Sequence, residues 1–214
     1  MNTRRFLFVI LFLFVFAAFP YPSFANHQNP TIFVISVVGR CLDILKSEKN
    51  KDIQREKILD LMRIYFDFPG IVETLLIDLK VSDRDKMTFT NFFPLLLEMR
   101  YSTFVRSPDS IRVEYVSHEF SADGLEAIVF TNTKILSREI ALHYKLRHVD
   151  GEWKIYDIAV ADVSLIGNYK AQIRKIFKSK SFADFIYEIE KIIGKKYSSH
   201  KDELKNRAIP LFYL

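Results

Sequence analysis

Residues 153–176 read WKIYDIAVADVSLIGNYKAQIRKI and contain the only tryptophan of the chain. The first half alternates apolar and polar side chains, which predicts a β-strand, and the second half has apolar residues at helical spacing. Ser164 stands between the two halves and is expected to cap the helix. Asp157 is expected to bond to backbone at the corner where the strand bends. The stretch therefore predicts a strand that turns directly into a basic helix.

Three further strands are predicted upstream of this one. The segment 110–120 alternates in part, 125–136 is rich in β-branched and aromatic residues, and 138–149 alternates cleanly. The pair Asp150-Gly151, between the third and fourth strands, is a strong signal for a hairpin turn. Four strands joined by short turns predict an antiparallel meander.

The remaining parts of the chain carry apolar residues at the spacing of helices. Helices are predicted over residues 30–47, 52–66, 70–77, 82–101, 167–177 and 182–193. Pro94 lies inside the fourth of these helices and is expected to kink or interrupt it. The predicted fold is α+β, a twisted four-stranded antiparallel sheet covered by about six or seven helices.

Residues 1–25 are predicted to form a cleavable secretory signal peptide. Arg4 and Arg5 precede an unbroken apolar run over residues 6–19, and Ser-Phe-Ala at 23–25 has the small-x-small form of a cleavage site. The run is shorter than the roughly 20 residues that a membrane-spanning helix needs. An uncleaved N-terminal anchor is the alternative.

Residues 26–195 are predicted to form one domain, followed by a C-terminal tail over 196–214. The net charge of +5 comes from 31 basic and 26 acidic residues that are mixed along the chain, and this pattern does not indicate nucleic-acid binding. Cys41 is the only cysteine, so an intramolecular disulfide is excluded and a core position is expected for it. No cofactor motif or metal-ligand spacing is present.

Three segments match the sequence pattern of one known family. The block WKIYDIAVADVSLIGNYKAQ, residues 153–172, has the form W-K-x-Y-D followed by S-L-x-x-N-Y-[RK]-x-Q. Residues 65–71, YFDFPGI, contain a Phe-Asp-Phe corner, and residues 89–105, FTNFFPLLLEMRYSTFV, form an aromatic segment. In these patterns, and in the order of its predicted elements, the chain resembles the MlaC family, also called toluene-tolerance Ttg2D.

The resemblance implies a periplasmic phospholipid-binding protein. The family fold is similar to nuclear transport factor 2 (NTF2-like), and lipid tails lie in an apolar pocket between sheet and helices. The implied ligand is a phospholipid. The implied partners are an inner-membrane ABC transporter with an MCE-domain subunit and an outer-membrane lipoprotein-porin complex. The resemblance implies a monomer in the periplasm that needs no cofactor.

The pocket implied by the resemblance is expected to be lined by one face of the sheet and by apolar helix residues. Alternation places Trp153, Ile155 and Asp157 on one face of the last strand. Tyr156 and Ile158 fall on the opposite face. A register error of one residue would exchange the two faces. The predicted lipid-binding residues are Phe68, Phe92, Leu96, Val113, Val129, Tyr144, Leu146, Tyr156 and Ile158.

Other interpretations of the same residues remain open. Lys170, Arg174 and Lys175 are expected to form a patch for a partner or a lipid head group, with a solvated helix face as the alternative. The apolar residues can line a cavity or fill a core, and a hopanoid is an alternative ligand. An enzyme would use Asp157 or His143, but no nucleophile elbow or paired-carboxylate motif accompanies them. The predicted function is therefore a lipid carrier without enzymatic activity.

Overall fold

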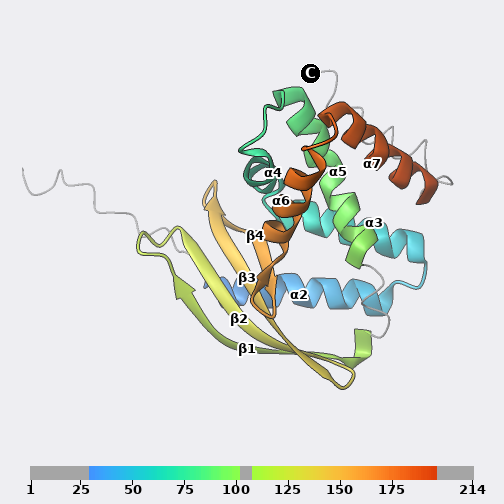
Figure 1. Cartoon of the computed structure of the whole chain (residues 1–214). Helices are drawn as coiled ribbons and strands as arrows, with labels where there is room; N and C mark the ends of the chain where they lie inside the picture. Colours follow the sequence, from blue (N-terminus) through green and yellow to red (C-terminus); the bar gives the residue numbers. More distant parts are fainter. Residues whose placement is uncertain (1–28, 102–107, 197–214) are drawn as a thin grey trace, which may run out of the picture.

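The computed structural model describes residues 29–101 and 108–196, which form six α-helices, one short 3₁₀ helix and a five-stranded antiparallel sheet (Figure 1). The predicted signal peptide and the predicted tail beyond residue 196 lie outside the described residues. The elements are α2 (Pro30–Ser47), α3 (Lys51–Tyr65), α4 (Phe68–Leu76), α5 (Asp83–Tyr101), η2 (Pro108–Ser110), β1 (Ile111–Phe120), β2 (Glu126–Ile135), β3 (Arg138–Val149), β4 (Glu152–Val160), β5 (Val163–Ser164), α6 (Leu165–Ile176) and α7 (Phe182–Lys196).

Side-chain caps define the ends of the first two helices. The side chain of Asn29 accepts a hydrogen bond from the backbone N–H of Thr31 at 2.9 Å, so it caps α2. Asn50 caps α3 in the same way. The side-chain amide of Gln54 donates to the carbonyls of Leu45 and Glu48 at 3.0 and 2.9 Å. These two bonds satisfy carbonyls at the C-terminal end of α2 and join the two helices.

Helix α5 is continuous through Pro94. At its start the Ser82 hydroxyl accepts the backbone N–H of Asp85 at 3.2 Å and donates to the Asp85 carboxylate at 2.8 Å. The expected interruption at Pro94 is absent. Phe93 directly precedes the proline and Phe89 lies five residues before it; both are fully buried, so packing against the other helices holds the chain in helical form.

The sheet has the strand order β1-β2-β3-β4-β5, and each neighbouring pair is antiparallel. Asp150 and Gly151 form the predicted turn between β3 and β4, with φ values of 52° and 83°. The prediction of four strands is incomplete, because the two-residue strand β5 pairs with β4. Ala161 and Asp162 make the connecting turn with φ values of 46° and 65°.

A bulge at Tyr156 changes the face on which the last strand presents its side chains. Lys145 pairs with Asp157, but the next residue of β3, Leu146, pairs with Ile155. Ile158 therefore returns to the face that carries Ile155, and Asp157 lies on the opposite face. The predicted alternation, which put Ile155 and Asp157 on one face, is wrong for this reason. We call the face with Leu146 the inner face and the face with Lys145 the outer face.

Two groups of buried side chains form the core. The inner-face cluster joins α2 and α3 to the sheet and consists of Phe33, Val34, Val37, Leu61, Ala127, Val129, Tyr144, Leu146, Trp153 and Ile155. The helical cluster joins α3 to α7 and consists of Leu59, Phe68, Ile71, Val72, Leu75, Leu76, Phe89, Phe93, Leu95, Leu97, Ile166, Ile173, Phe185, Ile189 and Ile193. Figure 1 shows α2 running past the strands, with α4 to α7 gathered beyond β4. Among the described residues, no helix has the length and apolar character needed to cross a membrane.

Candidate apolar binding site

A rim of partly buried apolar side chains borders the inner-face cluster. These residues come from α2, from the end of α3 and from three strands, and they are Val38, Ile44, Tyr65, Phe66, Tyr115, Leu142 and Ile158. We call this set the rim. Phe66 also packs against the helical cluster and marks where the two clusters meet.

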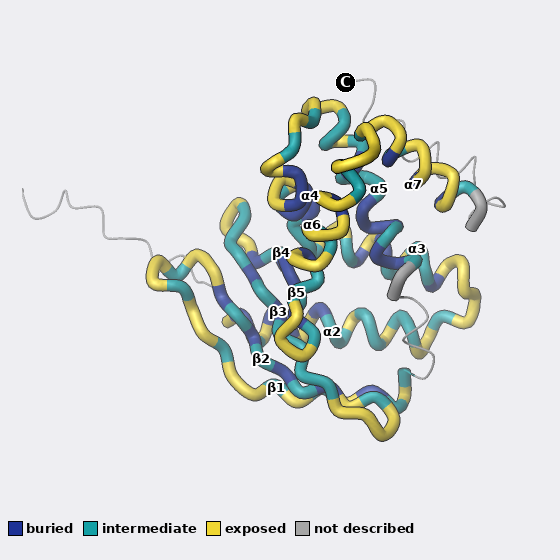
Figure 2. Tube along the Cα trace, viewed as in Figure 1, coloured by how far each residue is buried: buried dark blue, intermediate teal, exposed yellow. Residues whose placement is uncertain are grey.

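Burial along α2 is graded from one end to the other. Phe33, Val34 and Val37 in its first half are buried, whereas no residue from 38 to 47 is buried (Figure 2). Apolar side chains continue through the second half, at Val38 and Ile44, and remain partly exposed. The helix is therefore anchored to the sheet through its N-terminal half and leaves an incompletely covered apolar surface along its C-terminal half.

Three weakly acidic groups lie in this apolar environment. Cys41 is only partly buried and does not take the core position expected for it, but desolvation by the surrounding side chains raises the pKa of its thiol to about 11. Burial also raises the pKa of Tyr144, and the nearby Tyr115 and Cys41 add smaller increases. The Tyr115 hydroxyl has a pKa raised by its own burial. All three groups are therefore neutral at physiological pH and add no charge to the apolar surface.

Cys41 should react slowly with thiol-directed reagents. At pH 8 a thiol of pKa about 11 is ionised in roughly one molecule in a thousand, against roughly one in four for an ordinary cysteine. Alkylation by iodoacetamide at pH 8 is expected to be on the order of a hundredfold slower than that of free cysteine, and to accelerate as the pH rises. Intact-protein mass spectrometry measures the rate. Denatured protein serves as the control and should react at the ordinary rate; an ordinary rate for the folded protein would contradict the desolvation of this thiol.

The predicted lipid-binding residues divide between the two clusters. Val129, Tyr144 and Leu146 belong to the inner-face cluster and Ile158 to the rim. Val113 pairs with Thr133, which lies on the same face of β2 as Val129. The others lie in or against the helical cluster: Phe68, Phe92, Leu96 and Tyr156. The structure therefore places five of the six sheet residues on the inner face and separates them from Tyr156 and from the α4 and α5 residues. Whether these residues line a lipid pocket stays a prediction.

Asp157 connects α6 to the outer face of the sheet. Its side chain is 5 % exposed, one oxygen accepts the backbone N–H of Ile166 at 3.1 Å, and the other lies 3.0 Å from Lys145 Nζ. Ser164 accepts the backbone N–H of Gly167 at 2.8 Å and caps α6. Both predictions for this corner, the serine cap and the aspartate bond to backbone, are confirmed. Because both carboxylate oxygens have partners within the protein, Asp157 has a structural role.

A second polar network attaches α4 to the sheet. Arg147 Nε lies 2.7 Å from Asp67 Oδ2, and its guanidinium stands 4.7 Å from the ring centre of Tyr156. The Tyr156 hydroxyl donates to Glu126 at 3.2 Å. Burial, with a further effect of the Glu126 charge, raises the pKa of Tyr156 to about 12, so the phenol remains a donor. Asp67 also caps α4 by accepting the backbone N–H of Gly70 at 3.0 Å.

Gly70→Ala is expected to destabilise the protein by about 1–3 kcal/mol. A Cβ at Gly70 would collide with the Asp67 carboxylate and lie 2.7 Å from Arg147, so the ion pair would have to move. Gly39→Ala is the matched control, because a Cβ there meets no atom within 4 Å and alanine favours helix by up to about 1 kcal/mol. Urea denaturation should show opposite shifts. A Gly70→Ala protein as stable as the original would contradict the tight approach of Arg147.

The predicted basic patch is partly neutralised by an acidic neighbour. Lys170 Nζ lies 3.7 Å from the Asp78 carboxylate, and Arg174 forms an ion pair with the same group. Lys175, the third residue, lies in the last turn of α6, where its positive charge interacts favourably with the negative end of the helix dipole. These pairs hold α6 against the turn that follows α4. The role of the patch towards a partner or head group stays a prediction.

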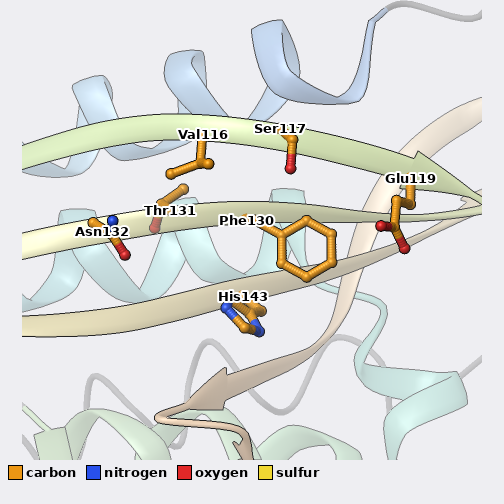
Figure 3. Close-up of a pocket in the computed structure, with 7 residues that line it drawn as sticks. All are labelled: Val116, Ser117, Glu119, Phe130, Thr131, Asn132 and His143. Carbon is orange, nitrogen blue, oxygen red and sulfur yellow. The ribbon is translucent and has the colours of Figure 1, made fainter.

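The outer face of the sheet carries a shallow hollow of about 360 Å³ beside a second bulge, at Val116 (Figure 3). Its lining residues are Val116, Ser117, Glu119, Phe130, Thr131, Asn132 and His143. The His143 ring contacts Phe130, and Nδ1 lies 3.5 Å from the exposed carboxylate of Asp162.

These groups do not form a catalytic arrangement. Ser117 and His143 both pair with Phe130, from opposite sides, so two strand spacings, roughly 9–10 Å, separate their backbones. A serine that is activated by histidine requires hydrogen-bond contact. Within residues 29–101 and 108–196, no three His, Cys, Asp or Glu side chains are grouped closely enough to hold a metal ion.

A sheet with helices packed on its apolar inner face is the arrangement of an α+β protein. The sequence profile of the MlaC protein family matches residues 36–191 of this chain, which is most of its length. The chain therefore belongs to the MlaC family, as the Trp-to-Gln block predicts.

The fold is similar to a solved structure, that of a phospholipid-binding protein from Ralstonia solanacearum in complex with a phospholipid. The TM-score is 0.68, the sequence identity is 17%, and the similarity covers 79% of this chain and 98% of the other. At this identity the likeness concerns the fold. No curated protein sequence matches the chain significantly.

Proposed function

We propose that this protein is a periplasmic carrier that binds the acyl chains of a phospholipid between α2 and the inner face of the sheet. The observation that carries the proposal is the rim, where apolar side chains from the helices and from three strands pack against the inner-face cluster without complete burial. Membership of the MlaC family supports the proposal, as does the phospholipid bound by the R. solanacearum protein of the same fold. These findings favour a binding protein over an enzyme.

The energetics require nearly complete enclosure of the lipid tails. Each methylene transferred from water to an apolar site gains about 0.8 kcal/mol, so two acyl chains of roughly 25–30 methylenes gain on the order of 20 kcal/mol. A membrane offers nearly the same gain, so a carrier competes only if it covers both chains. The C-terminal half of α2 carries no buried residue, so its apolar side chains are available to cover the acyl chains.

The remaining parts of the proposal follow from the family. Residues 1–25 act as a cleaved export signal, residues 26–195 form the lipid-binding domain, and residues 196–214 form a tail. The carrier works as a monomer that exchanges lipid with an outer-membrane lipoprotein-porin complex and with an inner-membrane ABC transporter bearing an MCE-domain subunit. The head group stays outside the apolar site, which explains why a phosphate-binding glycine loop is not needed in the sequence.

Native mass spectrometry of the protein purified from the periplasm, followed by lipid extraction, tests the proposal. A discrete adduct that yields a phospholipid on extraction is the expected result, and N-terminal sequencing should begin near Asn26. A hopanoid in the extract would replace the phospholipid as ligand and keep the carrier function. A protein that carries no lipid and takes none up from phospholipid vesicles would contradict the proposal.

A further inference from the structure

A buried hydroxyl on the inner face has no hydrogen-bond partner. Thr133 of β2 is 3 % exposed, and its Oγ1 atom is both inaccessible to water and unpaired within the part of the chain that the structure describes. Buried polar groups in folded proteins are almost always paired, because an unmet hydrogen bond in an apolar environment destabilises the fold. An exception of this kind calls for a partner that the described chain does not supply, such as a water molecule or a bound ligand.

The neighbours of Thr133 are apolar and belong to the candidate lipid site. On adjoining strands Thr133 pairs with Val113 and with Ile140, both partly buried. Two residues along β2, Thr131 pairs in the same way with Tyr115 and Leu142 of the rim. Side chains alternate along a strand, so all these groups share the inner face. The unpaired hydroxyl therefore lies beside the partly exposed surface that is proposed to hold acyl chains.

Thr131 shows that a threonine on this face can be paired within the protein. It is 1 % exposed, and its hydroxyl donates to the carbonyl of Leu142 at 2.8 Å. The two threonines have the same side chain, strand and face, and they differ in this one hydrogen bond. Thr131 is therefore a matched reference for Thr133.

We propose that the Thr133 hydroxyl donates a hydrogen bond to an ester carbonyl of a bound diacyl phospholipid. This inference rests on the proposed function. The partner must be an acceptor that tolerates an uncharged environment, since the inner-face positions that pair with Thr133 and Thr131 are all uncharged. A phosphate group would be buried there without a cation, which is strongly unfavourable. An ester carbonyl is neutral and is the first polar group at the glycerol end of each acyl chain, so it reaches an apolar site together with the chain.

The test compares two phosphatidylglycerols with equal chain lengths, one with ester-linked chains and one with ether-linked chains. Purified protein stripped of lipid is offered an equal mixture in vesicles, and mass spectrometry gives the ratio of bound lipids. The original protein is expected to prefer the ester lipid about 3- to 10-fold, the value of one hydrogen bond. Thr133→Val should reduce the ratio to about one, because valine keeps the shape and removes the donor.

Two control variants separate the hydrogen bond from packing. Thr133→Ser keeps the hydroxyl and should keep the preference, and Thr131→Val should keep it because that hydroxyl already serves Leu142. Thermal unfolding of lipid-stripped Thr133→Val should occur at an equal or higher temperature, since an unpaired buried hydroxyl has been removed. Equal binding of both lipids by the original protein, or a preference that survives in Thr133→Val, would overturn the inference alone. Failure to bind either lipid would overturn the proposed function and the inference together.

Discussion

Val38→Trp is expected to abolish the recovery of phospholipid with the purified protein while leaving its fold intact. Val38 belongs to the rim, on α2, and is only partly buried, so a larger side chain has room to lie against the sheet. There it would occupy the apolar surface that acyl chains need. Lipid extraction should show a drop of at least about tenfold in bound phospholipid, since a bulky indole excludes many methylenes worth about 0.8 kcal/mol each. Circular dichroism and thermal unfolding check the fold.

Two other tryptophan substitutions provide the controls. Val129 is fully buried in the inner-face cluster, so Val129→Trp should lower the stability by about 1–3 kcal/mol or more through overpacking. Ile35 lies on the solvent side of α2 and is 44% exposed, so Ile35→Trp should change neither lipid content nor stability. Val38→Trp protein that still carries a full complement of lipid would show that acyl chains bind elsewhere.

Asp157→Ala should be the most destabilising single substitution among the polar residues described, at about 3–5 kcal/mol. The change leaves Lys145 without its carboxylate at 3.0 Å and the backbone N–H of Ile166 without its acceptor. It therefore frees the first turn of α6 from the sheet and leaves the partly buried ammonium group of Lys145 without its carboxylate. Urea denaturation of lipid-stripped protein measures the loss.

The controls for Asp157 distinguish charge from hydrogen bonding. Asp157→Asn keeps an oxygen for Ile166 but removes the charge facing Lys145, so an intermediate loss is expected. Asp162→Ala removes a carboxylate that is 87% exposed, and surface changes of this kind stay within about 0.5 kcal/mol. If Asp157→Ala proved as mild as Asp162→Ala, the structural role of Asp157 would be refuted.

Features that depend only on residues close in the sequence were predictable from the sequence. The turn at Asp150-Gly151 requires two positive φ angles, and this residue pair is the common solution. Ser164 caps α6 through a hydrogen bond to a residue three positions away. The main helices and four strands also follow from periodicity, because most present one face to a core. Pro94 is different: its local penalty is real, but the packing of Phe93 and its neighbours overrides it.

The separation of the predicted lipid-binding residues into two clusters could not be predicted, because it depends on pairing between residues that are distant in the sequence. The bulge at Tyr156 arises from the pairing of β3 with β4 and moves Ile158 to the inner face. No turn residue or change of composition marks it. Strand β5 was missed for a related reason, since Ala161 and Asp162 adopt positive φ angles that glycine or asparagine usually signals. The unpaired hydroxyl of Thr133 likewise becomes visible only when every possible partner has been placed.

Because only the N-terminal half of α2 is buried against the sheet, hydrogen exchange along this helix can report whether the candidate site holds a ligand. Backbone amides near Val34 and Val37 sit over buried side chains, so their exchange with deuterium requires a large opening of the protein. Amides in the second half, from Cys41 to Leu45, lie among side chains that are only partly buried or exposed, so a smaller opening suffices for their exchange. One helix thus contains a slow and a fast half. A ligand that covers the second half would slow hydrogen exchange there and leave exchange in the first half unchanged. Exchange rates along α2 would therefore report both the stability of the fold and the binding of a ligand.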